Sequence, residues 1–147
     1  MKKILLLFFL SFPLFAESPF HTELVITSPF LSMTGYGGMR RANVHKGTDC
    51  YSVTYYPVIT SIMDGEAIEI GINDIYGKYV IVKHADSYFS LYAHGKLIYN
   101  SASGKITTDT PLMIIGSTGY SDDPHLHIEV WQVSEDKITY YDPEDFF

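Results

Sequence analysis

Short runs in which apolar and polar residues alternate recur along the chain, and no long segment keeps the spacing of an amphipathic helix. Alternation with a period of two is typical of strands that are buried on one face. Glycine, proline, asparagine and aspartate separate the runs, as expected of turns between strands. The pattern predicts strands at Pro57–Met63, Glu66–Ile70, Lys78–His84, Tyr88–His94, Pro111–Ile115 and His125–Val133.

The segments between these strands are too short to contain crossover helices, so the pattern favours antiparallel pairing. Asp64-Gly65 is a strong hairpin signal between the first two strands. Asn73-Asp74 and Ala85–Ser87 supply turns between later pairs. We therefore expect an all-β fold with a single antiparallel sheet over residues 22–147. The acidic end, residues 140–147, is expected to lie as a strap over this sheet.

The first residues of the chain have the layout of a secretory signal. Two lysines precede an apolar segment, residues 4–15, and Ala16 provides the small residue of a cleavage site. A membrane-spanning helix needs about 20 apolar residues, so this segment is short for a stable membrane anchor. The pattern predicts a cleaved signal at residues 1–16 and a secreted mature domain at 17–147, in the periplasm or outside the cell. An uncleaved N-terminal tether is the alternative.

The chain is acidic, with a formal net charge of −7, and loss of the two signal lysines would change this charge to −9. Such a charge repels polyphosphate backbones, which argues against nucleic acid as a partner. Cys50 is the only cysteine, so no disulfide can form within the chain and the apolar core must hold the domain together. We expect Cys50 to be buried as a small apolar residue.

The stretch DDPHLHIEVW, residues 122–131, contains two of the six histidines of the chain. Because successive side chains of a strand point to opposite faces, its leucine and isoleucine face the core, while His125, His127 and Glu129 share the other face. Residues two apart on a strand lie about 6.6 Å from each other, so the two imidazoles can reach one small site. Glu129 either orients one of these imidazoles or forms a surface salt bridge.

The strand that ends at His94 supplies a third histidine. The same alternation places Phe89, Leu91 and Ala93 on the core face and His94 on the opposite face. Any one of these histidines taken alone is compatible with a surface position or a hydrogen-bonded structural role. For His84, which closes a strand at a turn, we expect structural hydrogen bonding.

The segment VHKGTDC, residues 44–50, places His45 and Asp49 four positions apart. On an extended strand their Cα atoms would be separated by about 13 Å, which is too far for both side chains to bind one ion. Gly47 between them permits a bulge or a bend, and a bend brings the imidazole and the carboxylate together. The alternative is an ordinary turn with an aspartate at its end.

Together these segments contain the donors of a catalytic zinc site. Neutral imidazoles and a carboxylate suit zinc, and an open site uses three protein ligands and leaves a position for water. Bound zinc lowers the pKa of water to about 7 and polarises a peptide carbonyl. The HExxH motif of helical zinc peptidases is absent from the sequence.

The motifs and their order resemble those of the lysostaphin-type (LytM-like) zinc endopeptidases, which cleave peptide cross-links in bacterial cell walls. The matching segments are HKGTD (45–49), YAH (92–94) and GSTGYSDDPHLHIE (116–129), and the resemblance covers about residues 25–143. It implies a β-sheet domain with an active-site groove, and one zinc ion as the cofactor.

The same resemblance implies a role for each site residue. His45, Asp49 and His127 are expected to bind the zinc ion. His94 and His125 are expected to lie beside the bound water, one as general base and the other as acid or transition-state stabiliser. A neutral histidine with an ordinary pKa near 6.5 suits proton transfer at neutral pH.

The function implied is hydrolysis of peptidoglycan peptides by a secreted, monomeric zinc endopeptidase. The alternative is a non-catalytic module of the same fold that binds the cell wall or activates an amidase. Such a module is expected to have lost metal positions, whereas this sequence retains all of them. Residues 120–123, Tyr-Ser-Asp-Asp, replace a loop that is usually small and glycine-bearing in the family, and they place two acidic residues beside the groove. The sequence therefore does not identify which peptide cross-link is cut.

Overall fold

The structure is a computed structural model that describes residues 18–20, 23–33, 43–53 and 57–147. The predicted signal, residues 1–16, lies outside this part of the chain. Within the described ranges, no helix combines the length and the apolar character needed to cross a membrane.

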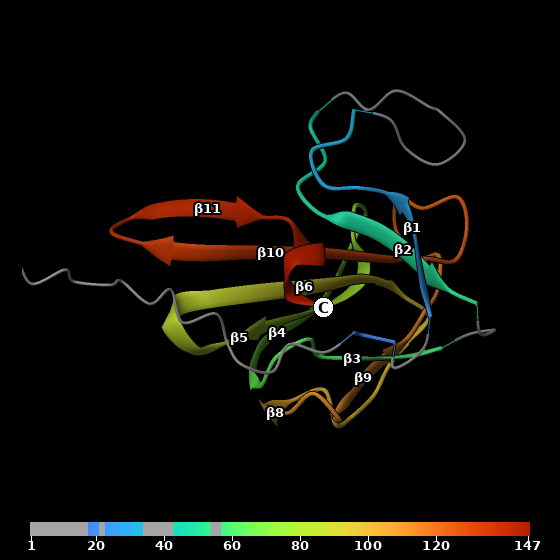
Figure 1. The fold of residues 1–147 in the computed structure, drawn as a ribbon. Helices are drawn as coiled ribbons and strands as arrows, with labels where there is room; N and C mark the ends of the chain where they lie inside the picture. The colour runs from blue at the N-terminus through green and yellow to red at the C-terminus, as the bar shows by residue number, and fades with distance from the viewer. Residues whose placement is uncertain (1–17, 21–22, 34–42, 54–56) are drawn as a thin grey trace, which may run out of the picture.

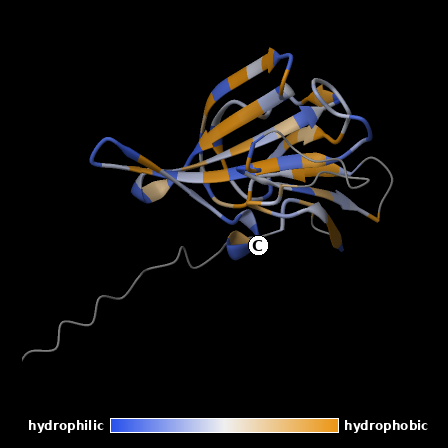
Figure 2. Cartoon of the chain, turned by 90° about the horizontal axis from the view of Figure 1, so that it is seen from above, coloured by the Kyte–Doolittle hydropathy of each residue, from blue (hydrophilic) through white to orange (hydrophobic). Residues whose placement is uncertain are grey.

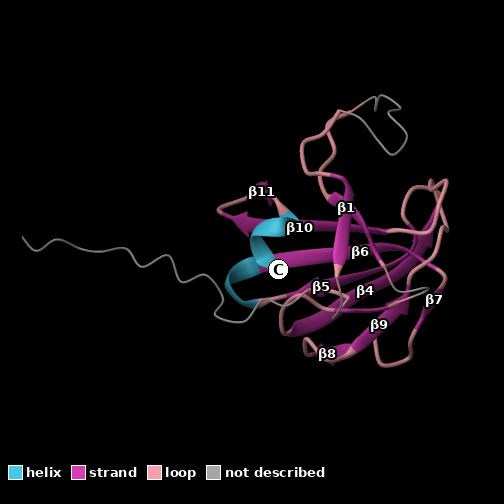
Figure 3. Cartoon of the chain, turned by 45° about the vertical axis from the view of Figure 1, so that its right-hand side comes forward, coloured by secondary structure: helices cyan, strands magenta, loops and turns pink. Residues whose placement is uncertain are grey.

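Nearly all regular structure in the described ranges is β-strand, and the helical segments there are the short 3-10 turns η2 and η3 (Figure 3). The elements are β1 (Leu24–Ser28), β2 (Thr48–Ser52), β3 (Val58–Thr60), β4 (Gly65–Asn73), β5 (Gly77–Lys83), η2 (Ala85–Ser87), β6 (Tyr88–Gly95), β7 (Leu97–Ile98), β8 (Gly104–Ile106), β9 (Pro111–Ile114), β10 (Leu126–Ser134), β11 (Lys137–Tyr141) and η3 (Pro143–Phe146).

The strands form two antiparallel sheets (Figure 1). The larger sheet has eight strands in the order β1-β2-β10-β6-β5-β4-β8, with β11 paired to β10, and the smaller has the order β3-β9-β7. Ile59 and Leu112 from the smaller sheet and Val80 and Ile128 from the larger belong to one buried cluster, which Phe146 of η3 also joins. The predicted all-β, antiparallel class is confirmed, but the strands divide between two sheets instead of forming one.

The hairpin predicted at Asp64-Gly65 is wrong, because β3 pairs with β9 and β4 pairs with β5. At this point the chain passes from the smaller sheet to the larger. A Cβ on Gly65 would lie 2.3 Å from the carbonyl oxygen of Lys83, so the glycine allows close packing of two strands. The predicted turns at Asn73-Asp74 and Ala85–Ser87 do connect β4 to β5 and β5 to β6.

β10 shows the alternation predicted for it. Leu126, Ile128 and Val130 are fully buried in the core, and His127 and Glu129 lie on the opposite face. Alternating orange and blue segments along the strands in Figure 2 reflect the same pattern in the sheet as a whole. Because β10 pairs with β2 on one side and with β6 on the other, its polar face lies in the middle of the larger sheet.

His84 is buried and has the structural role predicted for it. Its Nδ1–H donates to the carbonyl oxygen of Asp64 at 2.9 Å, and its Nε2 lies 2.7 Å from the hydroxyl of Ser90. The Ser90 hydroxyl in turn contacts the hydroxyl of Tyr92 at 2.9 Å, which accepts the backbone N–H of Ile62. This network joins β5 and β6 to the segment that connects the two sheets.

Acidification is expected to destabilise the protein through His84. Burial lowers the pKa of His84 below its ordinary value of 6.5, so the unfolded chain binds the proton more readily than the folded chain. The stabilisation is complete above about pH 6.5 and falls below it, by at most about 1.4 kcal/mol per pH unit. Urea unfolding at about pH 7 and about pH 5 should show a larger loss for the parent than for His84→Gln. Equal losses in the two proteins would contradict this prediction.

Candidate metal centre and active site

His45 and Asp49 meet at the start of β2. His45 lies in the loop before this strand, the backbone bends at Gly47, and Asp49 is within the strand. The bend places Nε2 of His45 3.2 Å from Oδ1 of Asp49. Cys50, the next residue, is fully buried as expected.

Gly47 is required by close packing, and not by an unusual backbone conformation as the sequence suggested. Its φ is not positive. A Cβ on Gly47 would lie 2.2 Å from the carbonyl oxygen of Ile128 and 2.9 Å from Cε1 of His127. The absent side chain therefore lets the loop before β2 pass directly against β10, and this contact holds His45 beside His127.

The pairing of β2 with β10 brings the third predicted ligand to the same point. The register of these antiparallel strands pairs Asp49 directly with His127. His127 Nδ1 lies 2.8 Å from Asp49 Oδ1 and 3.0 Å from His45 Nε2. All three residues are buried. One loop and two neighbouring strands thus bring three potential ligand atoms together.

The three atoms fit a zinc ion. Tetrahedral zinc with bonds of about 2.0–2.1 Å places its ligand atoms about 3.3 Å apart, and the separations here are 2.8, 3.0 and 3.2 Å. Nδ1–H of His45 donates to the carbonyl oxygen of Pro29 at 3.2 Å, and Nε2–H of His127 donates to Glu129 at 3.0 Å. Both imidazoles therefore turn their other ring nitrogen toward the carboxylate. Three polar atoms this close need a positive charge among them, which either a proton or a metal ion can supply.

The electrostatics also favour positive charge at this point. Burial alone would raise the pKa of Asp49, but hydrogen bonds with His127 and His45 hold this pKa well below its usual range. Burial alone would lower the pKa of His127, but hydrogen bonds to Asp49 and Glu129 raise it to about 9. Without a metal ion, a proton on His127 Nδ1 neutralises the site, and a divalent cation would displace that proton.

The predicted faces of β6 are wrong. β6 pairs Phe89, Leu91 and Ala93 with the residues of β10 that lie on its polar face, so this row faces the site and not the core. Tyr92, from the other row, is fully buried in the core. Strict alternation would then direct His94 toward the core together with Tyr92.

A β-bulge instead directs His94 toward the site. Between the pairs Val80↔Tyr92 and Lys78↔Gly95, β6 contains one residue more than β5. His94 lies in this bulge with a φ of 63°. Its ring centroid is 4.7 Å from that of His125 and 5.9 Å from that of His127.

His94 is held as a neutral imidazole. Its Nδ1–H donates to the carbonyl oxygen of Thr118 at 2.8 Å, and its backbone N–H donates to the carbonyl oxygen of Tyr76 at 2.8 Å. The lone pair of the ring is therefore on Nε2. Burial, assisted by the neighbouring His125, lowers the pKa of His94 to about 4. At neutral pH this ring is able to accept a proton.

His125 lies at the more open side of the site. It precedes β10, and its backbone forms a bridge to Gly116. Its Nδ1–H donates to the carbonyl oxygen of Asp123 at 2.8 Å, and its Nε2 lies 3.7 Å from Oδ1 of Asp49. Its side chain is 20% exposed, against 10% for Asp49. The structure therefore brings together all five residues that the sequence singled out.

Two further residues hold the site, and neither was assigned a role from the sequence, although Thr118 lies in the matched segment 116–129. Thr118 accepts the Nδ1–H of His94. Tyr76 accepts the backbone N–H of His94, and its ring stacks on His127 with centroids 5.9 Å apart and planes at 30°. All three contacts join residues that are far apart in the sequence, so the local sequence does not indicate which residues are paired.

Comparisons with known proteins identify the family. Residues 43–143 match the family model described as Peptidase family M23. An uncharacterized metalloprotease of Buchnera aphidicola is 31% identical over 121 residues, which are 82% of this chain and 32% of that protein. Peptidoglycan DD-endopeptidase ShyA of Vibrio cholerae is 28% identical over 116 residues, which are 79% of this chain and 27% of that protein. This chain thus spans about a third or less of the length of these relatives.

A solved structure shows the same fold. The catalytic domain of lysostaphin from Staphylococcus simulans has a TM-score of 0.61 and 24% sequence identity, covering 86% of this chain and 92% of that chain. The segment matched by the family model, residues 43–143, includes all five candidate site residues. The resemblance inferred from the motifs is confirmed, and the chain belongs to peptidase family M23.

Proposed function

We propose that this chain is a zinc-dependent endopeptidase that hydrolyses peptide cross-links of bacterial peptidoglycan. The observation that carries the proposal is the convergence of three buried ligand atoms, with two further histidines beside them. Membership of peptidase family M23 and similarity to a peptidoglycan DD-endopeptidase support it.

In this proposal His45, Asp49 and His127 hold one zinc ion. Two nitrogens and one oxygen are donors that zinc accepts, and three protein ligands leave a position for water. When bound, zinc would polarise the scissile carbonyl and lower the pKa of water. Asp49 supplies the negative charge that a buried cation needs.

We assign His94 as the general base. Thr118 holds its Nδ1–H, so Nε2 is the atom that takes up a proton. Because the pKa of His94 is about 4, the ring is neutral at pH values near 7. The bulge in β6 fixes its direction toward the other two imidazoles.

We assign His125 as the acid or transition-state stabiliser. Asp123 holds its Nδ1–H, which directs Nε2 toward the metal ligands. The ring is the more exposed of the two and lies 4.7 Å from that of His94, centroid to centroid. Two imidazoles at this separation can act on one scissile bond from neighbouring positions.

We further propose that the enzyme acts outside the cytoplasm, where peptidoglycan lies. Residues 1–16, with the layout of a secretory signal, would direct residues 17–147 to the periplasm or the exterior. The acidic charge of the chain, −7, supports a partner other than nucleic acid.

The test combines metal analysis with digestion of purified cell-wall sacculi. The purified protein is expected to contain about one zinc ion per chain and to release muropeptides that mass spectrometry identifies. A chelator should abolish both properties, and zinc, but not magnesium, should restore them. Protein that binds zinc and hydrolyses no wall preparation would favour the non-catalytic module, and digestion after complete removal of metal would contradict the zinc mechanism.

A further inference from the structure

Glu129 and Tyr76 form a hydrogen-bonded chain behind the proposed metal ligand His127. Oε1 of Glu129 accepts Nε2–H of His127 at 3.0 Å and the hydroxyl of Tyr76 at 2.9 Å. Glu129 is only 5% exposed. This geometry decides between the two roles that the sequence left open for Glu129, since a buried carboxylate bonded to an imidazole orients that imidazole.

Tyr76 also contacts the proposed general base. Its side chain lies against His127, whereas its backbone carbonyl oxygen accepts the N–H of His94 at 2.8 Å. Tyr76, in the turn between β4 and β5, therefore contacts the proposed metal ligand His127 through its side chain and His94 through its backbone.

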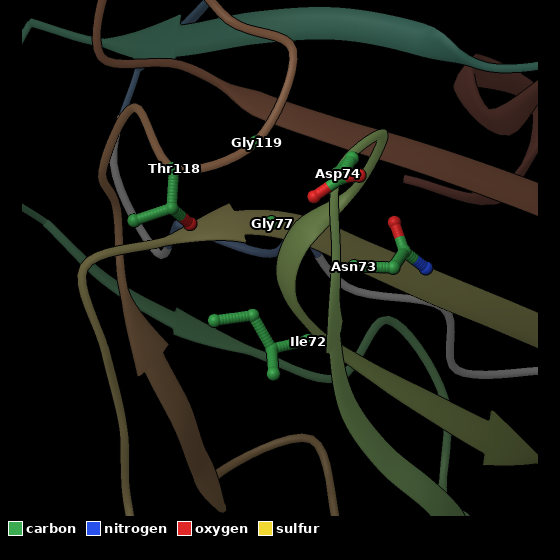
Figure 4. Close-up of a pocket in the computed structure, with 6 residues that line it drawn as sticks. All are labelled: Ile72, Asn73, Asp74, Gly77, Thr118 and Gly119. Atoms are coloured by element: carbon green, nitrogen blue, oxygen red, sulfur yellow. The ribbon is translucent and has the colours of Figure 1, made fainter.

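The turn that carries Tyr76 is itself held in place. Asn73 Oδ1 accepts the backbone N–H of Tyr76 at 2.7 Å. Gly77 and Gly119 lie against each other where the turn meets the loop that follows β9, beside a cavity of about 430 Å³ (Figure 4). A Cβ on Gly119 would lie 2.1 Å from the backbone nitrogen of Gly77. Such close backbone contact leaves Tyr76 little freedom to move.

We infer that Glu129 and Tyr76 are positioning residues that select the tautomer of His127 in which Nδ1 is available to the metal ion. A carboxylate that accepts Nε2–H keeps the proton on that nitrogen and leaves the lone pair on Nδ1. The Tyr76 hydroxyl holds the carboxylate in the orientation that this bond needs. The inference rests on the proposed function, because it takes His127 as a metal ligand.

The molecule contains a second tyrosine–glutamate pair, Tyr79 and Glu69, whose hydrogen bond does not involve His127. The ring of Tyr79 lies 5.8 Å from that of Tyr76, centroid to centroid, and Tyr79→Phe keeps this ring. Tyr79, three residues after Tyr76, donates its hydroxyl to Oε1 of Glu69. This second tyrosine–glutamate bond is exposed, and Glu69 lies on β4, which does not pair with β10. Substitutions in this pair control for the loss of a tyrosine–glutamate hydrogen bond as such.

The experiment measures the zinc affinity of the metal-free protein by competition with a chromophoric chelator. Glu129→Ala is expected to weaken zinc binding by about 10- to 100-fold. Tyr76→Phe, which removes only the hydroxyl, is expected to weaken it in the same direction by up to about tenfold. Glu69→Ala and Tyr79→Phe should bind zinc as the parent does.

A second readout separates positioning from a loss of stability. In the zinc-loaded parent, ¹⁵N NMR of the imidazole of His127 should show the proton on Nε2 and the metal on Nδ1. In Glu129→Ala the visible spectrum of the cobalt-loaded protein should change, because the imidazole is free to turn. Restoration of the parent spectrum in Glu129→Gln, whose amide oxygen can still accept Nε2–H, would support the inference.

Three results would be decisive. Zinc affinities of Glu129→Ala and Tyr76→Phe equal to those of the Glu69 and Tyr79 controls would overturn the positioning role and leave the proposed function intact. A parent protein that binds no zinc would instead overturn the proposed function. If Glu129→Ala does not fold, Tyr76→Phe decides, since it keeps the ring that packs on His127.

Discussion

Replacement of His127 by alanine is expected to abolish zinc binding and digestion of sacculi together. The substitution removes Nδ1, which lies within 3.0 Å of both other ligand atoms. Structural zinc in zinc-finger peptides binds with about 10–16 kcal/mol. On that scale, loss of one of three ligands should weaken zinc affinity by a factor on the order of 100 or more. Hydrolysis should fall below detection, because it depends on the bound ion.

His45→Ala is a second test of the ligand prediction, because it changes a residue in the loop before β2 instead of one in β10. His45 lies in the loop before β2, and the backbone pairing of β10 does not involve it. Zinc content by elemental analysis, release of muropeptides and circular dichroism should give the same result for both variants: a folded protein without zinc or activity. Stoichiometric zinc together with digestion in either variant would overturn the assignment of ligands.

Replacement of His94 is expected to separate zinc binding from turnover. The appropriate variant is His94→Asn, because asparagine tolerates the φ of 63° at this position and its amide can still donate to Thr118. The variant should keep its zinc and lose activity by about 10²- to 10⁴-fold, the usual contribution of a general base. His125→Ala should show the same separation, with zinc retained and kcat lowered.

The measurement for these two variants is zinc content alongside kcat and KM for a purified cross-linked muropeptide. A fall in kcat at constant zinc content would agree with roles in proton transfer or transition-state stabilisation. Loss of zinc in His94→Asn would show that His94 holds the metal. Unchanged kcat in both variants would remove these histidines from the mechanism.

The pattern of apolar and polar residues was sufficient to predict the structure where a strand is regular. The period of two in β10 predicted that Leu126 and Ile128 face the core and His127 the opposite side, because side chains alternate along any regular strand. Gly47 between His45 and Asp49 allowed either a bend that brings the two side chains together or an ordinary turn, and the structure shows the two side chains together.

The same rule failed where the strand is irregular. The prediction assigned the two faces of β6 the wrong way round. Apolar Leu91 and Ala93 face the site, whereas Tyr92 is buried in the core, where its hydroxyl accepts a hydrogen bond. The bulge that redirects His94 is a property of the pairing of β6 with β5. Nothing in the residues of β6 alone specifies where the extra residue falls.

The roles predicted for Gly47 and Gly65 were also wrong, because contacts between distant segments determine them. Gly65 was expected to close a hairpin and Gly47 to adopt an unusual backbone conformation. At both positions another backbone instead passes within 2.3 Å of the point that a Cβ atom would occupy. The sequence shows where a glycine lies. It does not show whether the glycine is needed for an unusual backbone conformation or for close packing against another segment.

By itself, the sequence determined the antiparallel β class, the family and the set of five candidate site residues, because these depend on residue type, order and alternation. Only the tertiary structure decided that the strands form two sheets, that a bulge turns His94 toward the ligands, and that Tyr76 and Glu129 stand behind His127. These features arise from strand register and from backbone contacts between distant segments, and such contacts are made only when the whole chain has folded.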